Sequence, residues 1–169
     1  MIRLFSIQDR LGWDNTVKLF ADYDVYYLSG YVMAFHIHGD GDPYLLYYEE
    51  NGLRAIYVYM RRPTVIEGVY DSVTPYGYGG VLFEGDASEA NRQAFWKAYL
   101  EEMAKEHIVD NFVRYHPVLK NAVPMKPISN VIDLGKTIAM DLASPRISTP
   151  RPRRSCSTCL HIPRASASS

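Results

Sequence analysis

The clearest pattern in the sequence is a pair of apolar runs, residues 44–49 and 53–60, on either side of Asn51-Gly52. Asn and Gly both accept the positive φ angles of a two-residue hairpin turn, so the runs predict a β-hairpin. Both runs are apolar at successive positions and not only at alternate ones. Such strands are buried on both faces, so we expect other elements to cover the hairpin on both sides.

Two short helices are predicted before the hairpin. The first spans residues 13–20, with Asp14 or Asn15 as its N-cap, because short polar side chains satisfy the free N–H groups there. The second spans residues 30–38 after Ser29 and ends at the glycine-rich run that follows it.

A longer helix is predicted from Asp86 to about His107. Asp86 and Glu89 have the spacing of a capping box at its start. The apolar residues that repeat along one face of this helix, and so predict its buried side, are Phe95, Tyr99, Leu100, Met103 and Ala104.

The remaining apolar runs predict single strands. They lie at residues 65–71, 111–115, 131–134 and 137–142, the last two separated by Gly135-Lys136. Helices, a hairpin and isolated strands in this order predict an α/β fold with a mixed sheet covered by helices.

Charge divides the chain in two. Residues 1–144 carry 13 basic and 19 acidic side chains, a net charge of −6, whereas residues 145–169 carry five arginines and no acid. The second part also holds four prolines, six serines and both cysteines. Its few apolar residues cannot offset the entropy of ordering it, so we predict a single domain over 1–144 and a disordered Ser/Arg/Pro-rich tail over 145–169.

The compartment follows from what the sequence lacks. It has no apolar run of about 18 residues, so no transmembrane helix is predicted. The first residues also lack the apolar core of a signal peptide, which favours the cytoplasm. An overall net charge of −1 argues against an obligate nucleic-acid binder, although the arginines of the tail could contact phosphates.

The segment from Thr74 to Gly80 is the most distinctive candidate site. Its glycines allow positive φ and the close approach of a ligand, and its backbone N–H groups could converge on an anion. In the alternative interpretation, the segment is a tight corner whose tyrosines pack on the sheet. The substrate-binding candidates in this segment are Tyr76, Gly77, Tyr78, Gly79 and Gly80.

Arg114 and His116 form a second candidate. They alternate with Tyr115 at the end of a predicted strand, so we expect both side chains on one face. Together they could bind a carboxylate or phosphate and move a proton. In the alternative interpretation, the arginine anchors a neighbouring loop and the histidine caps the turn before Pro117.

No metal site is predicted. The run Cys156-Ser157-Thr158-Cys159-Leu160-His161 has three ligand types where a structural zinc site needs four. His36 and His38 lie two apart on a helix and point in different directions. The sequence also lacks a nucleophile elbow, a Walker loop and a dinucleotide-binding fingerprint.

Several of these segments occur together in one known family. They are Asp24-Val25-Tyr26-Tyr27 before a helix, the hairpin ending in Arg61-Arg62-Pro63, the run from Asp71 to Gly80, and residues 112–119 followed by Asn121. Over residues 13–143 the chain resembles the N-terminal lobe of FemAB-like proteins, GNAT-fold relatives of the Fem-type peptidoglycan aminoacyltransferases. The most specific matches are Thr-Pro-Tyr-Gly-Tyr-Gly-Gly and Arg-Tyr-His-Pro.

The resemblance implies a GNAT-like lobe that takes part in moving an acyl group to an amine. The donor would be acyl-CoA or an aminoacyl-tRNA, the acceptor a small-molecule or peptide amine, and no cofactor would be bound in this chain. Asp71 and His116 are then the candidate catalytic bases, because the reaction needs a proton acceptor but no covalent intermediate. Thr74 stands where the coenzyme A loop of GNAT enzymes has Gln or Arg, so no coenzyme A site is expected there.

The resemblance also implies a second lobe, but the composition changes abruptly at Ser144-Pro145. A wrong reading frame, a gene fragment or a genuine basic arm would each give this change. The lobe by itself is then expected to be inactive and to self-associate through the apolar surface that a second lobe would cover. The alternative function is a non-catalytic module that binds a cell-wall peptide or carbohydrate through the Tyr/Gly-rich loop.

Overall fold

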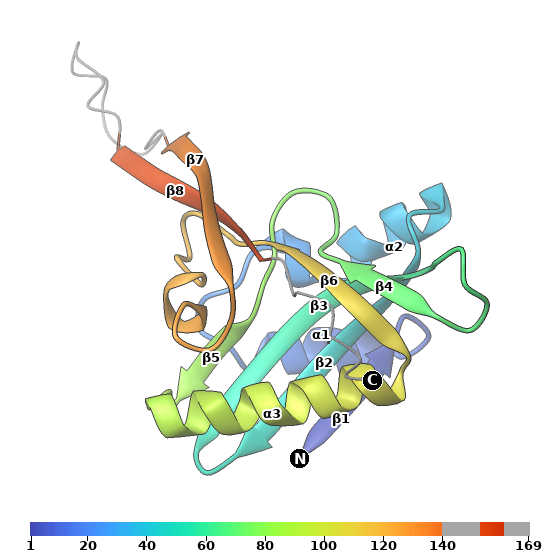
Figure 1. The fold of residues 1–169 in the computed structure, drawn as a ribbon, viewed down its shortest axis with the longest axis horizontal. Helices are drawn as coiled ribbons and strands as arrows, with labels where there is room; N and C mark the ends of the chain where they lie inside the picture. Colours follow the sequence, from blue (N-terminus) through green and yellow to red (C-terminus); the bar gives the residue numbers. More distant parts are fainter. Residues whose placement is uncertain (140–152, 161–169) are drawn as a thin grey trace, which may run out of the picture.

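The computed structural model of the chain, shown in Figure 1, describes residues 1–139 and 153–160. Its helices are α1 (Arg10–Val17), α2 (Ser29–His38) and α3 (Glu89–Lys105), with short 3-10 turns η1 (Val25–Tyr27) and η2 (Val123–Met125). Its strands are β1 (Ile2–Ser6), β2 (Asp42–Glu50), β3 (Leu53–Pro63), β4 (Tyr70–Val73), β5 (Leu82–Gly85), β6 (Ile108–Arg114), β7 (Val131–Ala139) and β8 (Arg153–Leu160).

The described strands form a mixed sheet in the order β1-β2-β3-β4-β6-β8-β7, with β5 also paired to β3. All neighbouring strands are antiparallel except β4 and β6, which run parallel. The chain reaches β6 from β5 through α3, the longest helix. The expectation of an α/β fold with a mixed sheet covered by helices is therefore confirmed.

The hairpin of β2 and β3 has the predicted turn. Glu50 lies opposite Leu53, and the two turn residues Asn51 and Gly52 have φ angles of 51° and 75°. The strands are longer than predicted, because Asp42 and Pro43 at one end still pair with Arg61 and Met60.

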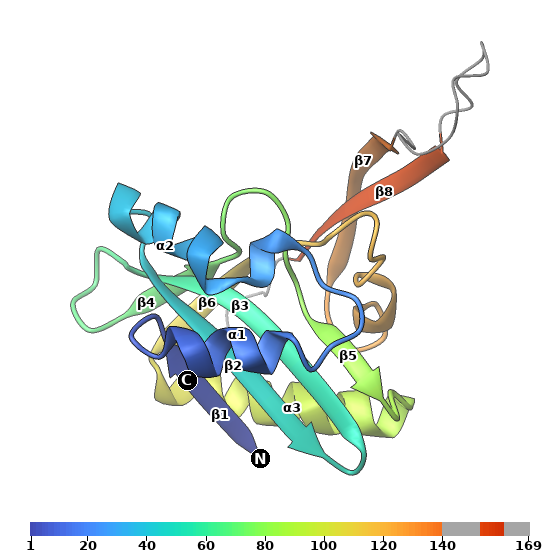
Figure 2. The same ribbon diagram turned by 180° about the vertical axis from the view of Figure 1, so that it is seen from behind.

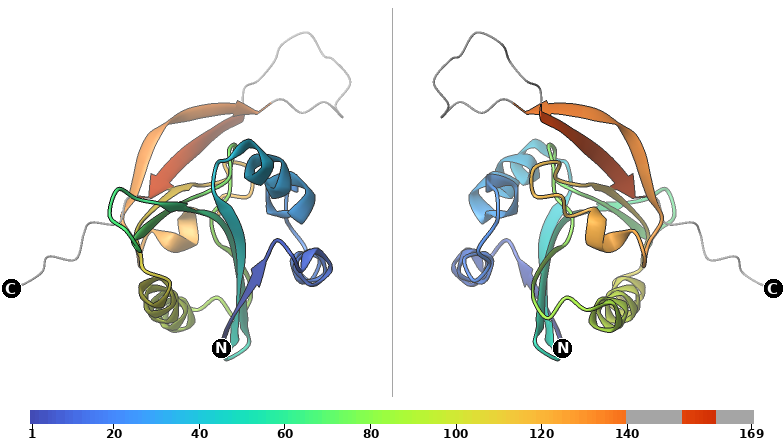
Figure 3. Two further views of the ribbon diagram at one scale, coloured as in Figure 1. Left: turned by 90° about the vertical axis from the view of Figure 1, so that its right-hand side faces the viewer. Right: turned by 90° about the vertical axis from the view of Figure 1, so that its left-hand side faces the viewer.

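The sheet is buried on both faces, as the hairpin pattern requires. Figure 1 shows α3 across one face, Figure 2 shows α1 and α2 across the other, and Figure 3 shows the sheet between them. Along β3, Ala55, Tyr57 and Tyr59 belong to the core under α3, whereas Ile56 and Val58 belong to the core under α1 and α2. Successive residues of one strand thus supply two separate cores.

The start of α3 differs from the prediction. The helix begins at Glu89 after Ser88, while Asp86 donates its backbone N–H to Gly52 and accepts one from Ser88. Asp86 therefore lies before the helix and connects the hairpin turn to α3, because two of its oxygens also accept from the side chain of Asn91. Of the predicted apolar stripe, Phe95, Tyr99 and Met103 are buried, whereas Leu100 and Ala104 are exposed.

The start of α1 was also predicted wrongly. The helix begins at Arg10, and the side chain of Asp9 accepts the N–H of Gly12 as its N-cap. Asp14 instead accepts the backbone N–H and the hydroxyl of Ser29, at 2.8 and 3.0 Å. A residue that resembles a cap in sequence therefore ties α1 to the start of α2.

The strand boundaries differ in several places. The pattern did not predict β1 or β5, and β4 is confined to residues 70–73. The expected pair of strands at 131–142 is a single strand β7 to Ala139, with a register irregularity between Asp133 and Gly135. The predicted turn residues Gly135 and Lys136 both pair with β8, and the residue that the register skips is Leu134.

Part of the predicted tail is described as a strand. Residues 153–160 form β8, which pairs with β7 along its length and meets β6 at Val113 and Arg114. The sequence predicts disorder for these residues, because they have few apolar side chains, whereas here they pair with β7 through backbone hydrogen bonds. The rest of the tail lies outside the described residues. Among the helices that are described, none is long and apolar enough to cross a membrane.

Candidate functional site

The two candidate segments from the sequence meet at the carboxyl ends of β4 and β6. Because these strands are parallel, the segments that follow them leave the sheet at the same edge, where ligands commonly bind in α/β sheets. Gly79 forms a bridge to Tyr115: its N–H donates to Arg114, and its carbonyl accepts from His116. Thr74, at the start of the glycine-rich segment, also accepts the N–H of Arg114 at its hydroxyl.

The glycines of this segment make room for aromatic rings. Gly77 has a φ of 99°, and a Cβ there would overlap the ring of Tyr26. Gly80 has a φ of 97°, and a Cβ would lie 2.5 Å from the ring of Tyr115. Both positions need glycine for the backbone angle and for the close approach of a ring. This geometry favours the interpretation of the segment as a corner packed by tyrosines.

Five rings next to this corner form what we call the tyrosine surface: Tyr26, Tyr31, Phe35, Tyr76 and Tyr78. Tyr26 lies 5.1 Å from Tyr31 and 5.9 Å from Tyr78, both edge to face. Phe35 connects Tyr31 to Tyr76 at 5.1 and 6.0 Å. Tyr76 is 73% exposed, so the cluster is open to solvent there.

The tyrosine surface is held in place by hydrogen bonds and carries neutral hydroxyls. Tyr31 donates its hydroxyl to the carbonyl of Tyr76 at 2.8 Å, which joins α2 to the glycine-rich corner. Burial and the nearby Asp24 carboxylate raise the pKa of Tyr26, and burial followed by the neighbouring Tyr26 raises the pKa of Tyr31. The hydroxyls of Tyr26 and Tyr31 therefore remain protonated at neutral pH.

His116 is buried beneath these rings, and both of its ring nitrogens have partners. Its Nδ1 accepts the backbone N–H groups of Val118 and Leu119, each at 3.2 Å. This assigns the ring hydrogen to Nε2, which lies 3.0 Å from a carboxylate oxygen of Asp24. The imidazole caps the turn that follows it and offers no free lone pair to a substrate. The capping interpretation is favoured.

Asn121 fastens the two candidate segments together. Its side-chain oxygen accepts the N–H of His116 at 2.8 Å. Its amide nitrogen donates to the carbonyl of Gly79 at 2.8 Å and to the hydroxyl of Tyr27 at 3.0 Å. Tyr27 in turn donates to the carbonyl of Gly80. The sequence analysis did not predict Asn121 or Asp24 as site residues. It named their segments only as part of the resemblance to FemAB-like proteins.

Asp71 lies away from this junction. It pairs with Asp110 in register, and β6 continues four residues further to Arg114, about 13 Å along the strand. Both of its oxygens accept from Arg62 at 2.8 Å, and this bond raises the pKa of the Arg62 side chain. The structure therefore does not bring the two predicted catalytic residues together, and it gives Asp71 a surface ion pair.

Arg114 and His116 do not share one environment. Arg114 is the last residue of β6 and is exposed, whereas His116 is 5% exposed. The expectation that both face one side assumed that the strand continues to His116. Because β6 ends at Arg114, the alternation of strand residues does not reach the histidine.

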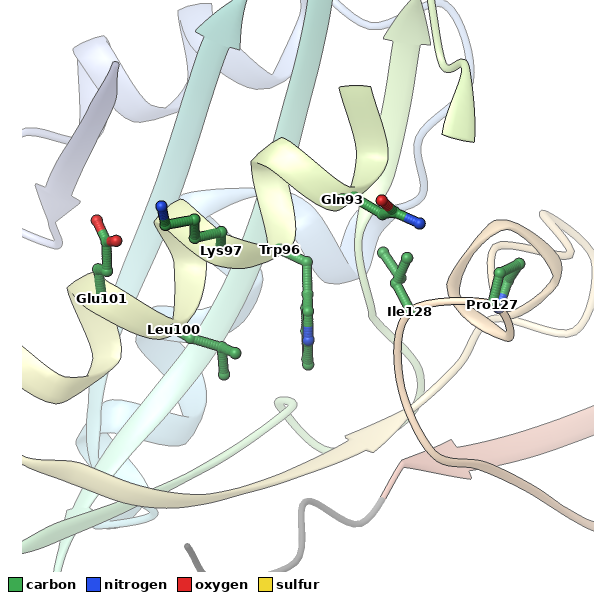
Figure 4. Close-up of a pocket in the computed structure, with 7 residues that line it drawn as sticks. All are labelled: Gln93, Trp96, Lys97, Leu100, Glu101, Pro127 and Ile128. Carbon is green, nitrogen blue, oxygen red and sulfur yellow. The ribbon is translucent and has the colours of Figure 1, made fainter. Parts of the chain in front are cut away.

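Two hollows lie outside the tyrosine surface. One, of about 490 Å³, lies between residues 81–84 and residues 118–121. The other, of about 370 Å³ and shown in Figure 4, lies between α3 and Pro127-Ile128, with Trp96 and Leu100 as apolar walls. None of the predicted site residues lines either hollow. Within the described residues, no group of three or more His, Cys, Asp or Glu side chains could hold a metal ion.

Comparisons with known proteins do not assign a function, so the functional argument depends on the geometry and the sequence motifs. No family model matches the chain, and neither the curated proteins nor the solved structures contain a match to it. The features that bear on function are therefore the tyrosine surface, the junction at Asn121 and the two hollows.

Proposed function

We propose that the predicted domain, residues 1–144, is a GNAT-like first lobe of an N-acyltransferase or aminoacyltransferase. In this proposal the tyrosine surface binds the amine-bearing acceptor. The observation that carries the proposal is the position of a solvent-open group of five aromatic rings at the carboxyl ends of β4 and β6. The mixed sheet, with helices on both faces, is compatible with the fold that the FemAB-like motifs imply.

The chemistry of the tyrosine surface suits a peptide or carbohydrate acceptor. Flat aromatic faces pack against C–H groups of sugars and peptide side chains, and tyrosine hydroxyls add hydrogen bonds. The protonated hydroxyl of Tyr26, whose pKa is raised by burial, can donate to carbonyl and hydroxyl oxygens, whereas the hydroxyl of Tyr31 already donates to Tyr76 and can only accept. Acyl-CoA and aminoacyl-tRNA remain the proposed donors on the strength of the resemblance.

Within this proposal His116 and Asp71 act as positioning residues. His116 and Asp24 hold the turn and the rings of Tyr26 and Tyr78, which lie 5.7 and 5.5 Å from the imidazole. Asp71 holds Arg62. The proton that leaves the attacking amine is then accepted by a group outside this pair.

A second candidate is a non-catalytic module that binds the same class of ligand. The observation that favours it is that the polar atoms of both predicted bases already have partners: backbone N–H groups and Asp24 for His116, and Arg62 for Asp71. The two candidates share the tyrosine surface and differ only in whether transfer occurs there.

One experiment separates the two candidates. Muropeptide fragments are titrated into the chain while tryptophan and tyrosine fluorescence is followed. The same fragments are then incubated with acyl-CoA or aminoacyl-tRNA, and the acylated amine is sought by mass spectrometry. We expect Tyr76→Ala to weaken binding and the matched Tyr23→Ala, which removes an exposed tyrosine elsewhere, to leave it unchanged. Binding with transfer supports the acyltransferase, binding alone supports the module, and no binding contradicts both.

A further inference from the structure

The hollow beside β5 has one wall that is the backbone of a strand edge. Within residues 1–139 and 153–160, β5 pairs with β3 alone, so no described strand lies beside the other edge of this short strand. In Figures 1 and 2 the segment that follows β6 runs past β5 on the side away from β3. The hollow of about 490 Å³ lies between them, a size typical of ligand sites.

The register of β5 shows which of its backbone groups face the hollow. Asp86 donates its N–H to Gly52, which makes Gly52 and Asp86 a hydrogen-bonded pair of the antiparallel ladder. Such pairs alternate along a ladder, so Glu84 and Leu82 direct their backbone groups to β3 as well. The N–H and carbonyl of Phe83 therefore point away from β3, towards the hollow. These groups of Phe83 have no hydrogen-bond partner among the described residues.

The other walls suit the side chains of a bound strand. The lining also includes the apolar residues Phe20, Val118, Leu119 and Pro124. Asp22, Glu84 and Lys120 add two acidic and one basic side chain to the lining, and Glu84 already accepts from Ala21 and Arg54. Asn121 fixes the opposite wall by its bonds to Gly79 and His116, so the walls are held apart without a ligand.

We propose that this groove, the β5 groove, binds an extended peptide, which adds a strand to the free edge of β5. Residues 81–84 span about 10 Å, which matches about three residues of an extended chain. Backbone hydrogen bonds between the peptide and Phe83 would fix the register of the peptide against β5, and alternate side chains of the peptide would pack on the apolar residues of the groove. The proposal does not depend on acyl transfer or on the tyrosine surface.

The test uses the peptide acetyl-Thr-Val-Thr-Val-Thr-amide, which has high strand propensity, and the same peptide N-methylated at alternate residues. Amide NMR spectra of the full chain follow the titration. We expect the Phe83 amide to shift and to become protected from hydrogen exchange, whereas the Leu82 amide, already in the ladder, changes little. N-methylation at the pairing positions is expected to abolish binding.

A matched pair of variants tests the backbone group directly. Phe83→Pro removes the outward N–H without breaking the ladder to β3, since proline is tolerated at edge positions whose N–H faces solvent. Phe83→Ala loses the same ring, which packs on Phe95 at 5.2 Å, but keeps the N–H. We expect Phe83→Pro to bind the peptide about three- to tenfold more weakly than Phe83→Ala, the range of one hydrogen bond.

The outcomes that overturn the proposal are distinct from failure of the proposed function. Equal binding by the two Phe83 variants, or binding that survives N-methylation, would show that the groove takes an apolar group and not a strand. If Phe83→Pro does not fold, the N-methylated peptide and the amide shifts in the unmodified chain still decide. Shifts confined to residues 26–35 and 76–78 would assign the peptide to the tyrosine surface and contradict the β5 groove, whereas Tyr76→Ala should leave binding in the groove unchanged.

Discussion

Replacing Asn121 by alanine tests the junction that joins the two candidate segments. The side chain is 5% exposed and makes three hydrogen bonds, to the N–H of His116, the carbonyl of Gly79 and the hydroxyl of Tyr27. Tyr27 keeps its bond to Gly80, and the N–H of His116 and the carbonyl of Gly79 keep their bond to each other, so no group is left without a partner. The substitution removes three buried hydrogen bonds worth about 0.5–1.5 kcal/mol each, so we expect the free energy of unfolding to fall by about 1.5–4.5 kcal/mol.

The matched control is Asn91→Ala. The amide of Asn91 also makes three hydrogen bonds, to Asn51 and to two oxygens of Asp86, but it does so at the surface. Water replaces those bonds, so the expected loss is about 0.5 kcal/mol. Urea unfolding followed by tryptophan fluorescence measures both, and equal slopes in urea confirm that the unfolded states are comparable. A loss for Asn121→Ala no larger than that for Asn91→Ala would refute the role of the junction.

Three further predictions concern the glycines, the histidine and the alkaline range. Gly77→Ala should lower the melting temperature more than Gly68→Ala. Both glycines have positive φ, but only a Cβ at position 77 would overlap a ring, that of Tyr26. Equal losses of melting temperature would mean that the ring of Tyr26 is not fixed. His116→Asn should keep the turn, since an asparagine oxygen can accept the N–H groups of Val118 and Leu119. His116→Ala should speed the hydrogen exchange of these two amides. If His116→Asn loses ligand binding while the turn stays protected from exchange, a direct role of His116 in the site is favoured instead. Burial, and then the bond to Glu49, raises the pKa of Tyr47 to about 12. The contribution of protonated Tyr47 to folding stability is therefore complete below the ordinary tyrosine pKa near 10, and it is lost as the pH rises to about 12. Glu49→Gln should lower that pKa, which the pH dependence of tyrosinate absorbance measures against Tyr47→Phe.

Local patterns predicted the elements whose stability is local. Asn51-Gly52 specifies its turn by backbone angle alone, and Gly39 ends α2 with a φ of 97°. The double apolar pattern of the hairpin also predicted cores on both faces of the sheet. The predicted helix starts were wrong where an acidic residue has a partner far away in the sequence. Asp14 binds Ser29 and Asp86 binds Gly52, and neither contact can be recognised from the residue spacing.

The sequence selected the two segments that meet at the candidate site but not the partners of their polar groups. The glycine-rich run and the segment around His116 were both selected, and the parallel pairing of β4 and β6 brings them together. The roles depend on partners far apart in sequence. Asp24 lies 92 residues from His116, and Asn121 lies 42 from Gly79, so no local pattern could show that these polar groups are already occupied.

The alternation along β3 has a consequence for how the chain unfolds. Its odd-numbered residues from 55 to 59 belong to one core, and the even-numbered ones between them to the other. If α1 and α2 detach, Ile56 and Val58 lose their cover, and the strand that supports Tyr57 and Tyr59 loses its backing at the same time. The two cores should therefore melt together in one cooperative transition, and a cavity made on either face should lower a single melting temperature for both.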